Sequence, residues 1–147
     1  MNDVVQQKPT RTIANVPDGM QPMVLARLIQ QRIEAAPDDA ASIVFVARDG
    51  RRLQRMADIL SAMLPGHPVL TLPAWDSLPY DRVSPNNVTI AARMSTLAAL
   101  TTGSKGAVVL TAVNALIQRL PPRDVVETMS FSAAAGRIVD SEKLIAW

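Results

Sequence analysis

The segment Asp18–Pro22 lies where a nucleotide-binding protein would carry its phosphate loop, between a β-prone stretch at Thr12–Val16 and a helix. Phosphate binding there requires glycines with free backbone N–H groups, a lysine for the β- and γ-phosphates, and a hydroxyl for Mg²⁺. The residues present are Asp18, Gly19, Met20, Gln21 and Pro22. Proline lacks an N–H donor, and the carboxylate of Asp18 would repel a phosphate. The sequence therefore predicts a degenerate P-loop without ATPase activity.

Four arginines open a second predicted helix: Arg48, Arg51, Arg52 and Arg55. They form either a solvated face, partly balanced by neighbouring aspartates, or a contact for the phosphate backbone of a nucleic acid. The chain carries 15 basic and 13 acidic residues, a net charge of +2. This small excess is a weak argument for nucleic acid, so we favour the solvated face and keep the phosphate contact as the alternative.

A proline-rich segment, Leu72–Pro85 (LPAWDSLPYDRVSP), follows neither helical nor strand periodicity. Its exposed Trp, Tyr, Asp and Arg side chains would suit a recognition patch. The alternative is that Trp75, Leu78 and Tyr80 pin an irregular surface loop to the sheet. Large aromatic side chains are usually mostly buried, which favours this second interpretation.

Residue counts exclude several kinds of chemistry. The chain has no cysteine, and His67 is its one histidine. Disulfides, thiolate zinc sites, a cysteine nucleophile and two-histidine metal motifs are therefore ruled out. The acidic pair Asp38-Asp39 lies in a turn without a second carboxylate motif. We expect no catalytic residue, no cofactor site and no metal site in this chain.

Targeting and membrane signals are weak. Residues Met1–Thr10 are polar and lack the apolar core of a signal peptide. The longest apolar runs are short and interrupted by charge, so no segment is expected to span a bilayer. Hydrophobic residues make up 48% of the chain and charged residues 19%, which excludes a disordered chain. We expect a soluble, cytoplasmic protein with no membrane partner.

Strand and helix patterns alternate along the chain. Apolar, β-branched runs predict three buried strands: Ser42–Ala47, Val69–Leu72 and Ala107–Thr111. Three long helices are predicted around them. The first runs from Pro22 and ends before Pro37, the second follows the N-cap Asp49 and is ended by Pro65-Gly66, and the third follows Asn86 or Asn87 and ends before the turn at Gly103. This alternation indicates an α/β fold whose parallel sheet is flanked by helices. Ligands on such folds bind beyond the carboxyl ends of the strands.

Weaker signals complete the prediction. Met94 lies on the apolar stripe of the third helix and is expected in the core. Thr111 is expected to cap a short helix that Pro121-Pro122 ends. Thr128–Phe131 is expected to form a further strand, and Ser141 to open a last helix.

Two parts of the chain carry a family resemblance. The first is Leu72–Pro85 followed by ARMSTL (Ala92–Leu97), and the second is VLTAVNALIQRLPP (Val109–Pro122). Both resemble the N-terminal region of the Mfd family of bacterial transcription-repair coupling factors, over about Ile13 to Trp147. The signature residues of the loop are Trp75, Leu78, Pro79, Tyr80, Asp81, Arg82, Ser84 and Pro85.

The resemblance implies a domain like the first domain of the repair protein UvrB, without a working ATPase. Only Asn86–Ala92 separates the two halves of the first motif, which leaves no room for the DNA-clamping hairpin of UvrB. The parent protein is implied to be an ATP-driven translocase on double-stranded DNA that displaces stalled RNA polymerase and recruits UvrA. ATP and Mg²⁺ would bind its motor domains, outside this chain. This domain would be a non-catalytic scaffold with intramolecular contacts to other domains.

The expected organisation has three parts: a flexible leader at 1–11, the UvrB-like domain at 12–126, and the truncated start of the UvrA-recruiting domain at 127–147. The family's UvrA-contact strand would follow Trp147, so no UvrA-contact residue is assigned. Two rivals remain. One is an active nucleotide hydrolase, which the absent lysine opposes. The other is a stand-alone DNA-binding or protein-interaction module that uses the Arg48–Arg55 face.

Overall fold

The computed structural model describes residues 12–35, 43–77, 80, 82–104, 106–130 and 136. Its centre is a parallel sheet of three strands: β1 (Ile43–Ala47), β2 (Val69–Leu72) and β3 (Val108–Ala112). The order is β1-β3-β2, so the last strand lies between the other two. Every residue of β3 is buried, as its uninterrupted apolar run predicts. The predicted α/β class is confirmed.

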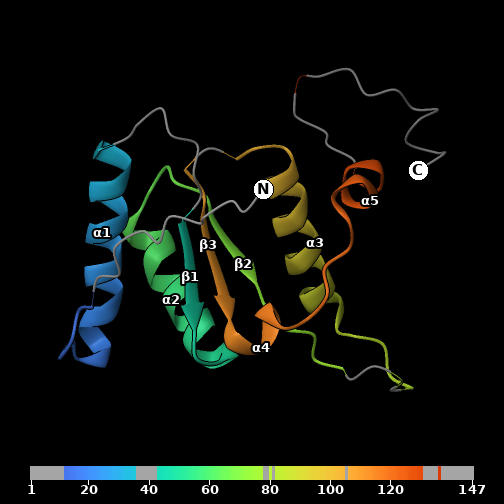
Figure 1. Cartoon of the computed structure of the whole chain (residues 1–147), viewed down its shortest axis with the longest axis horizontal. Helices are drawn as coiled ribbons and strands as arrows, with labels where there is room; N and C mark the ends of the chain where they lie inside the picture. The colour runs from blue at the N-terminus through green and yellow to red at the C-terminus, as the bar shows by residue number, and fades with distance from the viewer. Residues whose placement is uncertain are drawn as a thin grey trace, which may run out of the picture.

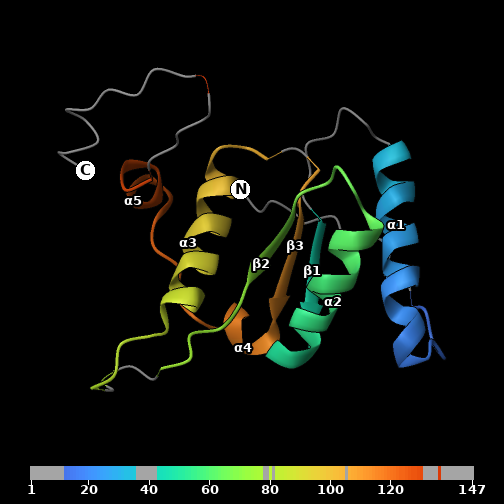
Figure 2. The ribbon, with the colours of Figure 1, turned by 180° about the vertical axis from the view of Figure 1, so that it is seen from behind.

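Helices cover the sheet on both sides (Figure 1). One side carries α1 (Gln21–Ala35), preceded by a 3₁₀ turn η1 (Asp18–Met20), and α2 (Gly50–Met63). The other side carries α3 (Asn87–Thr101) and, packed on it, α5 (Arg123–Thr128). The short α4 (Val113–Leu116) follows β3 at the carboxyl end of the sheet. Figure 2 shows the same layers from behind.

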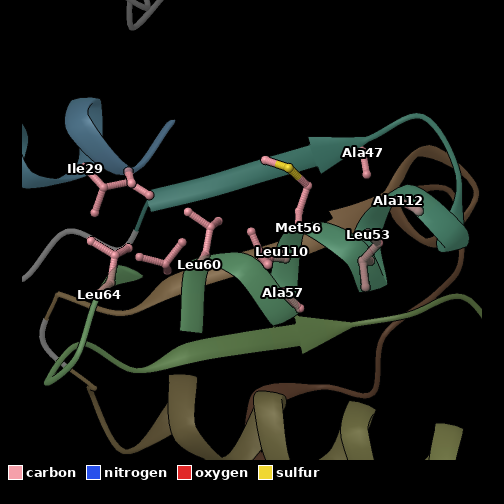
Figure 3. Close-up of a cluster of buried hydrophobic side chains, with 11 residues drawn as sticks. Ile29, Ala47, Leu53, Met56, Ala57, Leu60, Leu64, Leu110 and Ala112 are labelled. Carbon is pink, nitrogen blue, oxygen red and sulfur yellow. The ribbon is translucent and has the colours of Figure 1, made fainter. Parts of the chain in front are cut away.

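The main core lies between the sheet and the α1–α2 layer (Figure 3). Leu60 of α2 is 0% exposed, as is Leu110 of β3. The other buried members come from α1, α2, β1 and β3: Ala26, Ile29, Ala47, Leu53, Met56, Ala57, Leu64, Val108 and Ala112. A smaller cluster of Leu72, Leu97 and Val126 joins β2, α3 and α5. The second predicted helix, which follows Asp49, therefore supplies much of the main core.

Two polar residues set the starts of the long helices. The carboxylate of Asp49 accepts a hydrogen bond from the backbone N–H of Arg52 at 2.8 Å and caps α2. That bond, and a side-chain bond from Arg48, hold the pKa of Asp49 below its ordinary value of 3.8. Asn86 caps α3 by accepting from the N–H of Val88 at 2.9 Å. Both predicted caps are confirmed.

The third helix buries the polar residues Arg93 and Thr96 beside Leu97 and leaves Met94 outside the core. Met94 is 38% exposed, whereas Arg93 and Thr96 are buried. The hydroxyl of Thr96 donates to the carbonyl of Thr71 at 2.6 Å, so a polar side chain ties α3 to β2. The prediction that Met94 lies in the core was wrong. The face of α3 that is buried carries Arg93 and Thr96 and meets carbonyl groups at the end of β2 and in the loop that follows it.

Three predictions for the short elements were also wrong. Thr12–Val16 is not a strand. Thr111 does not cap α4, because its hydroxyl donates to the carbonyl of Leu72 at 2.9 Å inside the sheet. Thr128 ends α5, a helix that the sequence reading missed, rather than opening a strand. The predicted helix at Ser141 lies outside the described residues.

Candidate functional site

The degenerate loop and the arginine cluster meet in one pocket. It has a volume of about 450 Å³ and lies at the carboxyl end of β1, between the start of α1 and the start of α2. In Figure 1 this is the lower end of the molecule, where the strand arrows point. The loop contributes Asp18, Gly19 and Pro22 to its lining. The other side contributes Arg48, Asp49, Arg51, Arg52 and Arg55. Sequence reasoning found both groups but not that they face each other.

Arg52 holds the loop against α2. Its Nη2 donates to Oδ1 of Asp18 at 3.1 Å and also to the side-chain oxygen of Gln21. Gln21 in turn donates to the same Asp18 oxygen at 3.0 Å. The side chain of Asp18 is 79% exposed and that of Arg52 24%. Asp18 therefore provides the acceptor for an arginine at the point where a working phosphate loop would leave space for a phosphate.

The backbone of the loop is also unlike a phosphate cradle. The N–H of Met20 is used inside η1, where it donates to the carbonyl of Pro17 at 2.9 Å. A Cβ placed on Gly19 would meet nothing within 4 Å. Glycine is thus not required here for close approach of any described group. The loop geometry agrees with the degenerate sequence.

The remaining arginines of the pocket differ in their partners. Arg48 donates through Nε to Oδ2 of Asp49 at 3.2 Å, and its side chain is 81% exposed. Arg51 and Arg55 are exposed, and neither makes a hydrogen bond or ion pair within the described part of the chain. The pocket therefore presents two guanidinium groups without hydrogen-bond partners in the described residues, of which Arg51 also acts electrostatically on Asp49. The lining also includes Met56, which is buried, and Ile59, which is partly exposed.

A second cluster brings together the segments that carry the family resemblance. Arg93 of α3 is 0% exposed, and its guanidinium carbon lies 4.4 Å from the centroid of the Trp75 ring. Its Nη1 donates to the carbonyl of Pro73 and, at 3.3 Å, to Oε1 of Gln118. That same amide oxygen accepts from the backbone N–H of Trp75 at 2.9 Å. The Arg93 cluster, as we call Pro73, Trp75, Arg93 and Gln118, fixes the loop after β2 to α3 and to the segment after α4.

Arg93 is an unusual buried cation. Neither its Nε nor its Nη2 has a hydrogen-bond partner among the described residues. Burial away from water lowers its pKa. A buried charge without a carboxylate partner is costly unless hydrogen bonds compensate it, and Arg93 has only neutral oxygen acceptors at Pro73 and Gln118. Sequence reasoning missed Arg93 and Gln118 as structural residues, although both lie inside the motifs that carry the resemblance.

The signature loop divides into a fixed base and an exposed tip. Trp75 is half-buried, and Asp76 accepts from the backbone N–H of Asn86 at 3.2 Å, so the two ends of the loop are tied together. Tyr80 is fully exposed and has a left-handed φ of 76°. The expectation that Trp75 and Tyr80 both pin the loop is right for the first and wrong for the second. Arg82 and Ser84 are exposed and Pro85 is half-buried, while Leu78, Pro79 and Asp81 lie outside the described residues.

The described ranges also bear on metal and membrane binding. No group of three or more His, Cys, Asp or Glu side chains there is placed to hold a metal ion. Among the same residues, no helix is both long and apolar enough to cross a membrane.

Comparison with known proteins shows where the chain belongs. It is 30% identical over 117 residues to the transcription-repair-coupling factor of Haemophilus influenzae, an alignment that covers 80% of this chain. The chain is homologous to a segment of the transcription-repair-coupling factors. It is also 37% identical over 89 residues to the factor of Escherichia coli K12 and 32% identical over 110 residues to that of Myxococcus xanthus, covering 60% and 71% of the chain. No protein-family model matches it.

The resemblance drawn from the loop and strand motifs is thus confirmed. The chain spans less than a tenth of the length of these relatives, 8% of the Escherichia coli factor and 9% of the other two. The homology therefore identifies the family of this segment and does not extend to the activity of a whole coupling factor.

Proposed function

We propose that this chain is the non-catalytic N-terminal, UvrB-like domain of a transcription-repair coupling factor. One observation carries the proposal: the motifs shared with the family converge on the Arg93 cluster, which fixes the loop after β2 to the body of the fold. Family-specific residues that build the fold are expected in a structural domain. The pair of Asp18 and Arg52 at the position of a phosphate loop supports the absence of catalysis.

The parent protein, on this proposal, couples ATP hydrolysis to movement on double-stranded DNA, displaces stalled RNA polymerase and recruits UvrA for excision repair. ATP and Mg²⁺ bind motor domains encoded outside these residues. The domain makes intramolecular contacts that restrain the motor until polymerase engages it. The homology to coupling factors over most of this chain supports this proposal.

Two measurements test the proposal. The first reads the gene beyond Trp147, or takes the intact mass of the protein from cells. A protein several times longer, with a complete G-x-x-x-x-G-K-[ST] motif downstream, is the expected result. A stop codon near Trp147 would refute it.

The second measurement compares the basal ATPase of the full-length protein with that of a form lacking residues 12–126. Loss of an intramolecular restraint is expected to raise the basal rate. An unchanged rate would reject the restraining role, although not the family assignment.

A second candidate function is a DNA-binding or protein-interaction module that uses the Arg48–Arg55 face. The exposed Arg51 and Arg55 favour it. It predicts an affinity for duplex DNA that falls steeply with salt and weakens when these arginines are neutralised. Binding that is insensitive to salt would reject it.

A further inference from the structure

The arginine-lined pocket has the position and size of a small-molecule site. In parallel α/β sheets, ligands bind beyond the carboxyl ends of the strands. Arg48 and Asp49 directly follow β1 at that end and line the pocket. Its volume of about 450 Å³ falls within the range of roughly 300–1,000 Å³ that small-molecule pockets occupy.

The side chains that line the pocket keep a net positive charge after the ion pairs among them are counted. The carboxylate of Asp18 is engaged by Arg52, and that of Asp49 by the N-terminus of α2 and by Arg48. Arg51 and Arg55 are left without a hydrogen bond or ion pair in the described residues. They are four residues apart on one helix and therefore lie on the same face. Paired guanidinium groups are well suited to the oxygens of a phosphate, which they bind through two parallel hydrogen bonds.

The apolar side of the pocket narrows the choice of ligand. Its lining also includes Pro22, Met56 and Ile59. In a DNA duplex the bases are stacked and paired inside, so a duplex that contacts the arginines through its phosphates offers no free base to this surface. A small phosphate ester with a planar or apolar body can place its phosphate on the arginines and its body on these side chains.

We propose that this pocket binds a small phosphate-bearing ligand of mononucleotide size through Arg51 and Arg55, without hydrolysing it. Lysine and a Mg²⁺-binding hydroxyl are absent from the loop, so hydrolysis is not expected. The inference does not depend on the role of the chain within a longer protein. Its failure would leave the proposed function intact.

Calorimetric titration of the full 147-residue chain tests the inference. The probes are AMP, ADP, pyrophosphate and adenosine, and a short DNA duplex serves as the competing class of ligand. AMP or ADP is expected to bind more tightly than pyrophosphate, which lacks the body, and than adenosine, which lacks the phosphate. Absence of binding by every phosphate probe overturns the proposal, as does binding of duplex without binding of a nucleotide.

Paired variants assign the binding to the pocket. R51Q/R55Q is expected to weaken nucleotide binding at least about tenfold, because it removes charge-assisted hydrogen bonds. Both side chains are exposed, so the variant is expected to fold, which circular dichroism checks. The control R27Q/R119Q removes the same charge from exposed positions outside the pocket lining and is expected to change affinity less than about twofold. Equal losses in the two variants overturn the proposal in favour of general electrostatic attraction.

A third variant tests the apolar side. Ile59→Ala removes apolar surface from the pocket lining without placing a new charge four residues from Arg55, and it is expected to weaken nucleotide binding by about threefold or more. Unchanged affinity in this variant would contradict the proposed placement of the ligand body.

Discussion

Replacement of Arg93 separates the contribution of its shape from that of its charge. The side chain is 0% exposed, packs on Trp75, and leaves two nitrogens without partners in the described residues. Arg93→Met keeps an unbranched apolar stem in the same space and removes the charge. Arg93→Ala removes both. Comparison of the two variants therefore isolates packing.

The expected magnitudes follow from these contacts. Arg93→Met loses both hydrogen bonds of Nη1, of which the charged one to the Pro73 carbonyl contributes about 1.5–3 kcal/mol and the longer one to Gln118 less, and a cation–π contact of about 1 kcal/mol. Arg93→Met also no longer buries an unpaired charge, and this gain is of similar size to the loss. Its free energy of unfolding is therefore expected within about 1 kcal/mol of that of the wild type. Arg93→Ala also leaves a cavity and is expected to lie about 2–5 kcal/mol below Arg93→Met.

The assay is urea unfolding followed by far-ultraviolet circular dichroism, with the slope of the transition held common to the three proteins. A Met variant as unstable as the Ala variant would refute the reasoning, because the hydrogen bonds and not the packed stem would then hold the loop. A change in the slope would show that the variant alters the unfolded or native ensemble. The free energies of unfolding would then be compared at one common urea concentration.

Three further predictions concern the core, a helix cap and a buried hydroxyl. Leu60→Ala removes a 0% exposed side chain from the main core. It is expected to lower the free energy of unfolding, measured by urea titration, by about 2–5 kcal/mol. A loss below about 1 kcal/mol would contradict the position of Leu60 at the centre of the core. The pKa of Asp49 in the folded state lies below 3.8, so the ionised carboxylate stabilises the fold. The difference in free energy of unfolding between the wild type and Asp49→Asn is therefore expected to be constant above about pH 5 and to shrink as acid protonates the native carboxyl. A difference that grows in acid would contradict the direction of this pKa shift. Thr111→Val removes the hydroxyl that donates to Leu72 and is expected to cost about 1–3 kcal/mol by thermal unfolding, whereas a stabilised variant would show that this hydrogen bond is replaceable by packing.

The regular elements were predictable because their sequence signals are local. Val69–Leu72 has the bounds that its apolar run gives, and Asp49 and Asn86 cap the helices that they precede. A β-branched run and a capping side chain act through neighbours in the chain, so one sequence suffices to find them. The parallel sheet then follows from the alternation of strands and helices.

The errors arise where distant residues decide the outcome. The polar face of α3 is buried because Thr96 and Arg93 meet carbonyls at Thr71 and Pro73, some 20 to 25 residues away. The helix α5 was missed because Pro121-Pro122 was taken only as a stop. Proline also suits the start of a helix, and Pro122 is the N-cap of α5.

The candidate site was half predictable. The loop at Asp18 and the arginines from Arg48 to Arg55 stand out by residue type alone. Their meeting in one pocket depends on α1 lying against α2, which no local pattern encodes. The pairing of Arg52 with Asp18 spans 34 residues and is visible only in three dimensions.

The strand order has a consequence for synthesis on the ribosome. Because β3 separates β1 from β2, the first two strands have no hydrogen bonds to each other. A nascent chain that ends before Val108 therefore holds both outer strands without a partner for either. The sheet can form only after the segment 108–112 has been made and has left the exit tunnel. Until then the apolar edges of β1 and β2 are open to chaperones and to other nascent chains.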